Sequence, residues 1–174
     1  IFESPLYFEK TLLGNLLNEN GSFRVAHSDT EFPSSIREKL ENHTIDKIYI
    51  VGQGTAAVAG QALSQYLSEE TEISVESIPS TELSGFKLST DMSNVLVVAI
   101  SQSGTTTDTN RTVDLVRGRG ASVIAIVNRR NSDLSQKADG IIYTSDGRDI
   151  EMSVASTKAF YSQVAASILL GISI

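Results

Sequence analysis

The feature that most constrains the fold is a run of apolar residues at 95–100 that passes directly into Ser-Gln-Ser-Gly-Thr-Thr-Thr-Asp-Thr at 101–109. Consecutive apolar residues of this kind predict a strand that is buried on both faces. The glycine indicates a turn, and residues 105–117 have the apolar spacing of a helix. Three consecutive threonines are mediocre helix formers, so helix propensity does not explain their presence.

A strand, a glycine turn and a helix start rich in hydroxyl groups have the features of an anion site. The first backbone N–H groups of a helix have no partner within the helix, and the helix dipole is positive at that end. The hydroxyl groups add neutral hydrogen-bond donors. The segment therefore predicts a socket for a phosphate or another small anion.

The chain from residue 45 onward alternates between apolar strands and helices. Strands are expected at 45–51, 73–78, 95–100, 122–127 and 140–144, and helices at 56–67, 105–117, 132–137 and from Ser156 onward. This alternation predicts an α/β fold, a three-layer, doubly wound, five-stranded parallel sheet of flavodoxin-like order with helices on both faces. In that order the first and third strands are neighbours. The turns at 52–55 and 101–109 should therefore meet at the switch point of the sheet, where ligands bind.

The N-terminal part has a different pattern. Residues 1–20 carry leucine and phenylalanine at nearly helical spacing, and Pro5 suits a first turn, so a leading helix packed outside the sheet is expected. Residues 20–33 are expected to form a loop, and 34–42 a short helix. The 174 residues suffice for a single domain, 1–174, with its sheet core at 45–174. Because the sequence starts at Ile1 and stops within an apolar segment, we expect a fragment of a longer chain.

Composition argues against several partners. With 21 acidic and 14 basic residues the net charge is −7, and the longest basic cluster is Arg129-Arg130, so a nucleic acid partner is not expected. No apolar run approaches the roughly 20 residues of a spanning helix, so a membrane partner is not expected either. The absence of cysteine excludes disulfides and thiolate metal sites, and it is compatible with a cytoplasmic protein.

Neither glycine turn matches a nucleotide-binding motif. After Gly52-Gln53-Gly54 the next glycine is Gly60, and no acidic residue ends the second strand, so nicotinamide or flavin binding is not expected. No lysine lies in either turn, so the Walker pattern is absent. His27 and His43 have no carboxylate or cysteine at ligand spacing. We therefore expect neither a cofactor nor a metal, and we expect the histidines to have surface or capping roles.

A third polar segment, Glu-Met-Ser-Val-Ala-Ser-Thr-Lys at 151–158, follows the fifth strand. Taken alone it predicts a helix start that is capped by Ser156 or Thr157. Because it follows the carboxyl end of a strand, it can also fold back over the same site as the other two segments.

Together the three segments resemble the sugar isomerase (SIS) domain family, in particular the first of the two such domains in the isomerase half of glutamine:fructose-6-phosphate aminotransferases. The family pattern Ser-Gln-Ser-Gly-Glu-Thr-x-Asp-Thr is matched at 101–109, and Glu-Ile-Gly-Val-Ala-Ser-Thr-Lys-Ala-Phe is matched at 151–160. Gly-Cys-Gly-Thr-Ser is matched loosely at 52–56. Residues 1–5 resemble the opening of such a domain, so the likeness covers essentially the whole chain.

The resemblance implies a site for a hexose 6-phosphate such as fructose 6-phosphate or glucosamine 6-phosphate. The implied binding residues are Ser101, Gln102, Ser103 and Thr106 for the phosphate, Gly54 and Thr55 beside the sugar, and Val154 and Ser156 at its hydroxyl groups. The chain departs from the family pattern at Gln53, Ala56, Ala57, Thr105 and Ser153. Alanine at position 56 removes one sugar contact.

The resemblance also implies an enzyme of which this chain is a catalytically incomplete part. The proton-transferring glutamate, the ring-opening histidine and a C-terminal lysine would come from a second SIS domain, its tail or a neighbouring subunit, so no catalytic residue is assigned here, Glu151 included. The expected partners are that second domain and a second copy in a homodimer. Two alternatives remain open: a deaminase or deglycase relative without a glutaminase domain, and a non-catalytic phosphosugar sensor.

Overall fold

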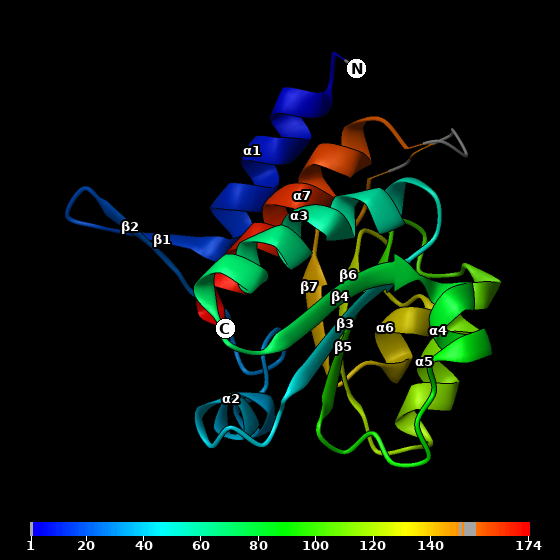
Figure 1. The fold of residues 1–174 in the computed structure, drawn as a ribbon. Helices are drawn as coiled ribbons and strands as arrows, with labels where there is room; N and C mark the ends of the chain where they lie inside the picture. The colour runs from blue at the N-terminus through cyan, green and yellow to red at the C-terminus, as the bar shows by residue number, and fades with distance from the viewer. Residues whose placement is uncertain (1, 150, 152–155) are drawn as a thin grey trace.

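The chain forms a five-stranded parallel sheet with helices on both faces in the computed structural model, which describes residues 2–149, 151 and 156–174 (Figure 1). The strands are β3 (Lys47–Gly52), β4 (Ser74–Pro79), β5 (Val95–Ser101), β6 (Ser122–Val127) and β7 (Gly140–Tyr143). Their order, β4-β3-β5-β6-β7, is the flavodoxin-like order predicted from the sequence. The predicted fold class is therefore confirmed.

The central strand β5 contributes to two separate cores because successive side chains point to opposite faces of a sheet. All seven of its residues are buried. Leu96, Val98 and Ile100 belong to one hydrophobic cluster, and residues 95, 97 and 99 belong to the other. Burial on both faces explains why this strand is a continuous apolar run and not an alternating one.

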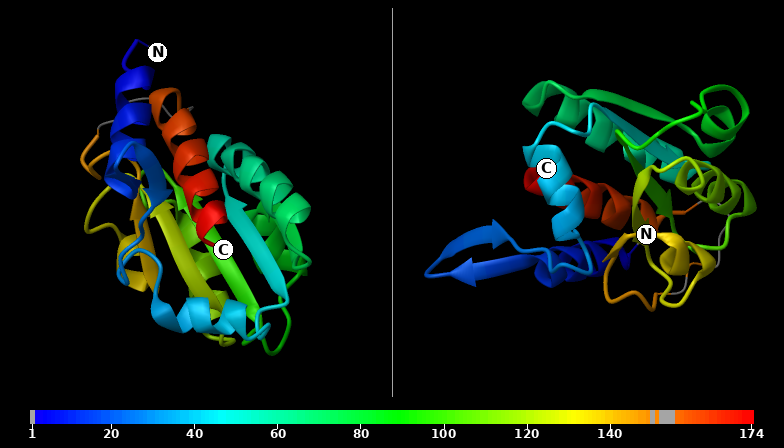
Figure 2. Two further views of the ribbon diagram at one scale, coloured as in Figure 1. Left: turned by 90° about the vertical axis from the view of Figure 1, so that its left-hand side faces the viewer. Right: turned by 90° about the horizontal axis from the view of Figure 1, so that it is seen from below.

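Helices cover both faces of the sheet (Figures 1 and 2). On the first face, α7 (Lys158–Ser173) packs between α1 (Ser4–Asn15) and α3 (Thr55–Glu70). On the second face lie α4 (Ser80–Phe86), α5 (Thr107–Arg117) and α6 (Asp133–Lys137). The short helix α2 (Ser34–Glu41) adds Ile36 and Leu40 to the core of the first face. The crossovers leave β3 and β5 adjacent at the switch point.

The N-terminal segment differs from its expected structure. The leading helix covers only Ser4–Asn15, and it is followed by a hairpin of β1 (Leu16–Glu19) and β2 (Ser22–Val25) where a helix end and a loop were expected. Asn20 and Gly21 connect the strands, both with positive φ, 55° and 88°. An Asn-Gly pair favours this kind of two-residue hairpin turn, so the turn chemistry outweighs the helical spacing of the leucines before it.

The buried residues of helix α1 are polar, and several of its larger apolar side chains are exposed. Thr11 and Asn15 are buried, and the Thr11 hydroxyl accepts a 2.8 Å hydrogen bond from the backbone N–H of Ser145. In contrast, Leu6 is 52% exposed and Leu13 is 67% exposed. The helix therefore presents an unpaired apolar face on the outside of the domain.

Helix α4 (Ser80–Phe86) lies in a stretch to which the sequence analysis assigned no element. Pro79 is its N-cap residue, and Leu83 is its one buried large apolar side chain. A helix of seven residues with a single buried anchor has too little periodic pattern to be recognised from sequence.

Candidate functional site

A cleft of about 370 Å³ opens at the carboxyl ends of β3 and β5, between the starts of α3 and α5 and the segment that leads into α7. Most of its lining is polar. The lining residues are Gln53, Thr55, Ala56, Ile100, Ser101, Gln102, Ser103, Thr106, Glu151, Ser156 and Gln163. The cleft lies at the switch point of the sheet, where the sequence predicts a ligand site.

The turn between β5 and α5 is held in place by its own hydroxyl and carbonyl groups. The Ser101 Oγ accepts a hydrogen bond from the N–H of Gly104 at 3.1 Å and lies 3.3 Å from the Thr106 Oγ1. The carbonyl oxygen of Gly104 accepts from the Asn110 side chain and from the N–H of Leu134. These contacts fix the position of the start of α5 relative to the strand end.

Gly104 is required by both conformation and space. Its φ of 65° is rarely adopted by other residues, and a Cβ atom there would lie 2.1 Å from the Ser132 Oγ. The carbonyl oxygen of the preceding Gln102 accepts a hydrogen bond from the N–H of Asn128 at 3.2 Å. The turn can therefore approach α6 and β6 closely, which a larger side chain would prevent.

The Ser103 hydroxyl lines the cleft, and its oxygen is engaged as an acceptor within the turn. Its oxygen accepts hydrogen bonds from the N–H of Thr105 at 3.2 Å and from the Thr105 hydroxyl at 3.0 Å. A hydroxyl oxygen has two acceptor positions and one hydrogen. With both acceptor positions used by Thr105, the hydrogen of Ser103 remains for a ligand in the cleft.

The start of α5 has no side-chain cap among the residues that the structure describes. Its N-cap residue, Thr106, makes no capping hydrogen bond and lines the cleft, and Asp108 is the acidic residue of its first turn. Uncapped N–H groups and the positive end of the helix dipole favour an anion at this position. The anion socket at residues 101–109 stays a prediction.

The turn after β3 forms the opposite wall of the cleft. Gly54 has φ 58° and precedes α3, and no side-chain hydrogen bond caps that helix within the described part of the chain. Gln53 extends across to the other wall, where its Nε2 lies 3.4 Å from both Thr81 Oγ1 and Asp108 Oδ2. Gln53 thus connects the turn after β3 to the starts of α4 and α5.

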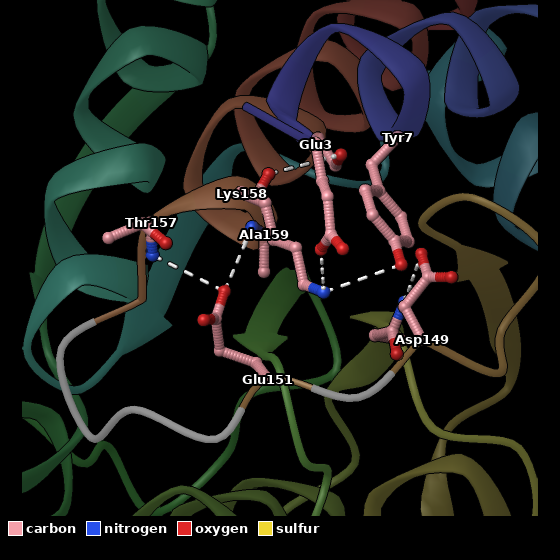
Figure 3. Close-up of polar contacts among 9 residues, drawn as sticks. Glu3, Tyr7, Asp149, Glu151, Thr157, Lys158 and Ala159 are labelled. Atoms are coloured by element: carbon pink, nitrogen blue, oxygen red, sulfur yellow. Dashed lines mark hydrogen bonds and ion pairs between the residues drawn. The ribbon is translucent and has the colours of Figure 1, made fainter. Parts of the chain in front are cut away.

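The start of α7 is occupied by a carboxylate of the chain itself (Figure 3). The Glu151 Oε2 accepts hydrogen bonds from the backbone N–H groups of Thr157 and Ala159, both at 3.3 Å. A carboxylate at this position satisfies N–H groups that a helix leaves unpaired and interacts favourably with the helix dipole. Glu151 also lines the cleft, so it brings negative charge to the side opposite α5.

Lys158 connects the start of α7 to α1. Its Nζ lies 2.6 Å from the Glu3 carboxylate and 3.3 Å from the Tyr7 hydroxyl, and it stacks on the Tyr7 ring (Figure 3). The hydrogen bond between the two groups lowers the pKa of the Glu3 carboxyl and raises the pKa of the Lys158 ammonium. Lys158 is therefore directed toward α1 and does not line the cleft.

Six of the eight predicted binding residues line the cleft: Thr55, Ser101, Gln102, Ser103, Thr106 and Ser156. Gly54 lies between two lining residues but is not itself one of them, and Val154 lies outside the described residues. The sequence analysis did not include Gln163, a buried residue of α7 that lines the cleft. A glutamine inside an apolar helix is a signal that could have identified it.

The histidines and the arginine pair do not line this cleft, although Arg129 lines an adjoining hollow that shares Gln102, Ser103 and Glu151 with it. The Nδ1 of His27 is 2.9 Å from the Ser173 hydroxyl, and burial lowers the pKa of this imidazole. His43 is exposed and has φ 52° just after α2. Arg130 stacks on Tyr143. No group of three or more acidic or histidine side chains within the described residues is placed to hold a metal ion.

The structure is a doubly wound α/β domain with a hydroxyl-lined cleft at the switch point of its sheet. Comparison with known families makes this more specific. The SIS domain model matches residues 43–173, and the chain belongs to the SIS domain family. The predicted family is thus confirmed.

The chain is also similar to part of larger enzymes. Over 174 residues it is 38% identical to the glutamine–fructose-6-phosphate aminotransferase (isomerizing) of Corynebacterium efficiens. The match covers 99% of this chain and 26% of that protein. The chain thus spans about a quarter of that relative.

Solved structures support the fold. The C-terminal domain of glucosamine-fructose-6-phosphate aminotransferase from Francisella tularensis matches 98% of this chain and 44% of its own length with a TM-score of 0.76 and 24% identity. The Vibrio vulnificus NanR protein, solved in complex with ManNAc-6P, matches 98% of this chain and 59% of its own length with a TM-score of 0.70 and 19% identity.

None of the helices described in the present structure is long and apolar enough to cross a membrane.

Proposed function

We propose that this SIS domain binds the phosphate group of a hexose 6-phosphate in the cleft at the switch point, as the first of two such domains in an isomerase unit of the glutamine:fructose-6-phosphate aminotransferase type. The observation that carries the proposal is the uncapped start of α5 beside the hydroxyls of Ser101, Ser103 and Thr106. Fructose 6-phosphate and glucosamine 6-phosphate are the ligands proposed.

The size and chemistry of the cleft suit this ligand class. A volume of about 370 Å³ lies at the lower end of the range for small-molecule sites. No lysine or arginine lines the cleft among the described residues, so the phosphate charge would be balanced by backbone N–H groups, the helix dipole and neutral hydroxyls. The ring hydroxyls of the sugar would meet the polar residues of the opposite wall.

We propose that the domain anchors the substrate and that the proton-transfer groups come from outside this chain. Glu151 is the one ionisable residue that lines the cleft in the described part of the chain, and its Oε2 already accepts two hydrogen bonds from α7. Aldose–ketose isomerisation moves a proton between two carbons through an enediol or enolamine, which requires positioned acid and base groups. Anchoring at the phosphate supplies binding energy remote from those carbons.

A second SIS domain is the partner we propose for the apolar face of α1. This face exposes Leu6 and Leu13, and the Francisella domain that shares the fold is more than twice as long as the matched part. A packed domain would remove the face from water. Homodimer formation and a cytoplasmic location stay predictions.

Titration of the Ser103→Ala variant with fructose 6-phosphate tests the proposal. Loss of a hydroxyl that donates to a charged phosphate should cost about 1.5–3 kcal/mol of binding free energy. The dissociation constant should therefore rise roughly 10- to 150-fold. Ser74→Ala is a matched control because Ser74 is exposed at the opposite end of the sheet. Equal affinities for the wild type and the Ser103 variant in isothermal titration calorimetry would rule out the phosphate assignment.

A further inference from the structure

Gln163 is an unusual residue for its position in the fold. It lies in α7, which is otherwise rich in alanine, leucine and isoleucine and packs between α1 and α3. Its exposed fraction is only 1%. Glutamine side chains are mostly exposed in proteins, and those that are buried normally have hydrogen-bond partners.

The carboxamide oxygen of Gln163 has no hydrogen-bond partner among the described residues. The neighbouring Ser162 is equally buried, but its hydroxyl donates to the carbonyl oxygen of Lys158 at 3.4 Å. A buried acceptor without a donor destabilises the folded state relative to an apolar side chain of similar shape. The packing of α7 therefore provides no reason for a glutamine at this position.

The location of Gln163 provides such a reason, because it lines the cleft. It does so together with the apolar side chains of Ala56 and Ile100, which offer no hydrogen-bond donor. The Ser156 Oγ, seven residues earlier and also in the cleft lining, is likewise buried without a partner in the described part of the chain. The α7 side of the cleft thus contains two buried polar atoms without a partner among the described residues.

We propose that Gln163 is a specificity-determining residue: its Oε1 accepts a hydrogen bond from a hydroxyl or amino group on the carbon skeleton of the bound hexose 6-phosphate. This inference rests on the proposed function, since it assumes that the phosphate lies at the start of α5. The two ends of the cleft then have separate tasks. The hydroxyls of 101–106 hold the charged group, and Gln163 selects ligands that carry a donor on the sugar.

The test replaces Gln163 by methionine, which keeps the length of the side chain but removes the strong acceptor. Calorimetric titrations of the full 174-residue chain use fructose 6-phosphate, glucosamine 6-phosphate and inorganic phosphate as probes. We expect Gln163→Met to weaken the binding of both sugar phosphates about tenfold. Binding of inorganic phosphate, which reaches only the anion socket, should stay within twofold of wild type. The melting temperature should not fall, because the variant removes an unpaired buried acceptor.

A matched control is available on the same helix. Ser167 lies one turn further along α7, and its hydroxyl is also buried without a partner among the described residues, but it does not line the cleft. Ser167→Ala should leave all three affinities unchanged. A second variant, Gln163→Glu, adds a negative charge and should favour the amino sugar phosphate over fructose 6-phosphate relative to wild type.

The possible failures are distinguishable. If Gln163→Met binds both sugar phosphates as wild type does, the inference is wrong. It is also wrong if the variant lowers the melting temperature and weakens the binding of inorganic phosphate as much as that of the sugar phosphates, because Gln163 is then a structural residue. In both cases the proposed function stands. If the wild-type chain binds inorganic phosphate but neither sugar phosphate, both the inference and the proposed ligand class are wrong.

Discussion

Of the helix starts that border the cleft, those of α5 and α7 are completed in opposite ways. At the start of α5 the N-cap residue makes no side-chain hydrogen bond, and the surrounding groups are the hydroxyls of Ser101, Ser103 and Thr106. At the start of α7 the Glu151 carboxylate already accepts hydrogen bonds from two backbone N–H groups. One helix start is open to an external anion, and the other is filled by an anion of the chain.

The neighbours of a helix start decide whether its N–H groups are left for a ligand. Both starts have N–H groups without partners inside the helix and a positive dipole end, as every α-helix does. Asp108 in the first turn of α5 faces the helix dipole but does not cap the N–H groups, whereas Glu151 accepts hydrogen bonds from those of α7. Exchanging or removing these neighbours should therefore change binding at one start and stability at the other.

The largest expected effect comes from giving α5 the kind of group that α7 already has. Ser103→Asp places a carboxylate in the anion socket, and two like charges about 4 Å apart repel by about 4 kcal/mol at a protein surface. We expect affinity for fructose 6-phosphate to fall by more than about 100-fold. Circular dichroism checks that the variant is folded. Wild-type affinity in calorimetry would show that the phosphate lies elsewhere.

A smaller effect is expected at α7 when its carboxylate is removed. Glu151→Ala leaves the N–H groups of Thr157 and Ala159 without their acceptor, and loss of such a cap costs about 1 kcal/mol of unfolding free energy. Urea denaturation measures the change. Ser103→Ala is the contrasting variant, because it should weaken ligand binding more than it destabilises the fold. An unchanged unfolding free energy for Glu151→Ala would contradict the capping role.

The smallest effect concerns the contact between Lys158 and α1. The Glu3 carboxyl has a lowered pKa and the Lys158 ammonium a raised pKa, so their interaction stabilises the fold at pH values between the two. Its contribution is present above the unfolded pKa of Glu3 and is lost as the pH falls through the folded pKa. It is also lost as the pH rises through the folded pKa of Lys158.

Thermal melts of Glu3→Gln across this pH range measure the contribution. The variant should melt slightly below wild type at neutral pH and at the same temperature in acid. Glu9→Gln, which changes an exposed carboxylate on the same helix, is the control. A difference that persists unchanged at acid pH would mean that the ion pair is not its source.

The sheet and most of the cleft could be predicted from the sequence because both depend on local patterns. A strand buried on two faces is a continuous apolar run, and a strand-to-helix turn contains its glycine and hydroxyls within a few residues, as at 101–106. Parallel strands in a known order then bring the turns after β3 and β5 together without further information.

The N-terminal segment and two cleft residues could not be predicted because their roles depend on distant partners. Helical spacing of leucines identifies a helix but not which side packs, and α1 packs through Thr11, whose partner is Ser145. Gln163 lies in a helix that is buried for other reasons, so only the folded structure shows that it borders the cleft. The capping role of Glu151 likewise appears only when α7 is in place.

The most direct test of the difference between the two helix starts is an NMR titration of the ¹⁵N-labelled chain with inorganic phosphate. Binding at the start of α5 should shift the backbone amide signals of residues 106–108 in a saturable manner, because these N–H groups have no capping side chain and would face the anion. The amide signals of Thr157 and Ala159, which Glu151 already engages, should stay in place. Saturable shifts at Thr157 and Ala159 without shifts at 106–108 would contradict the assignment of the phosphate to α5.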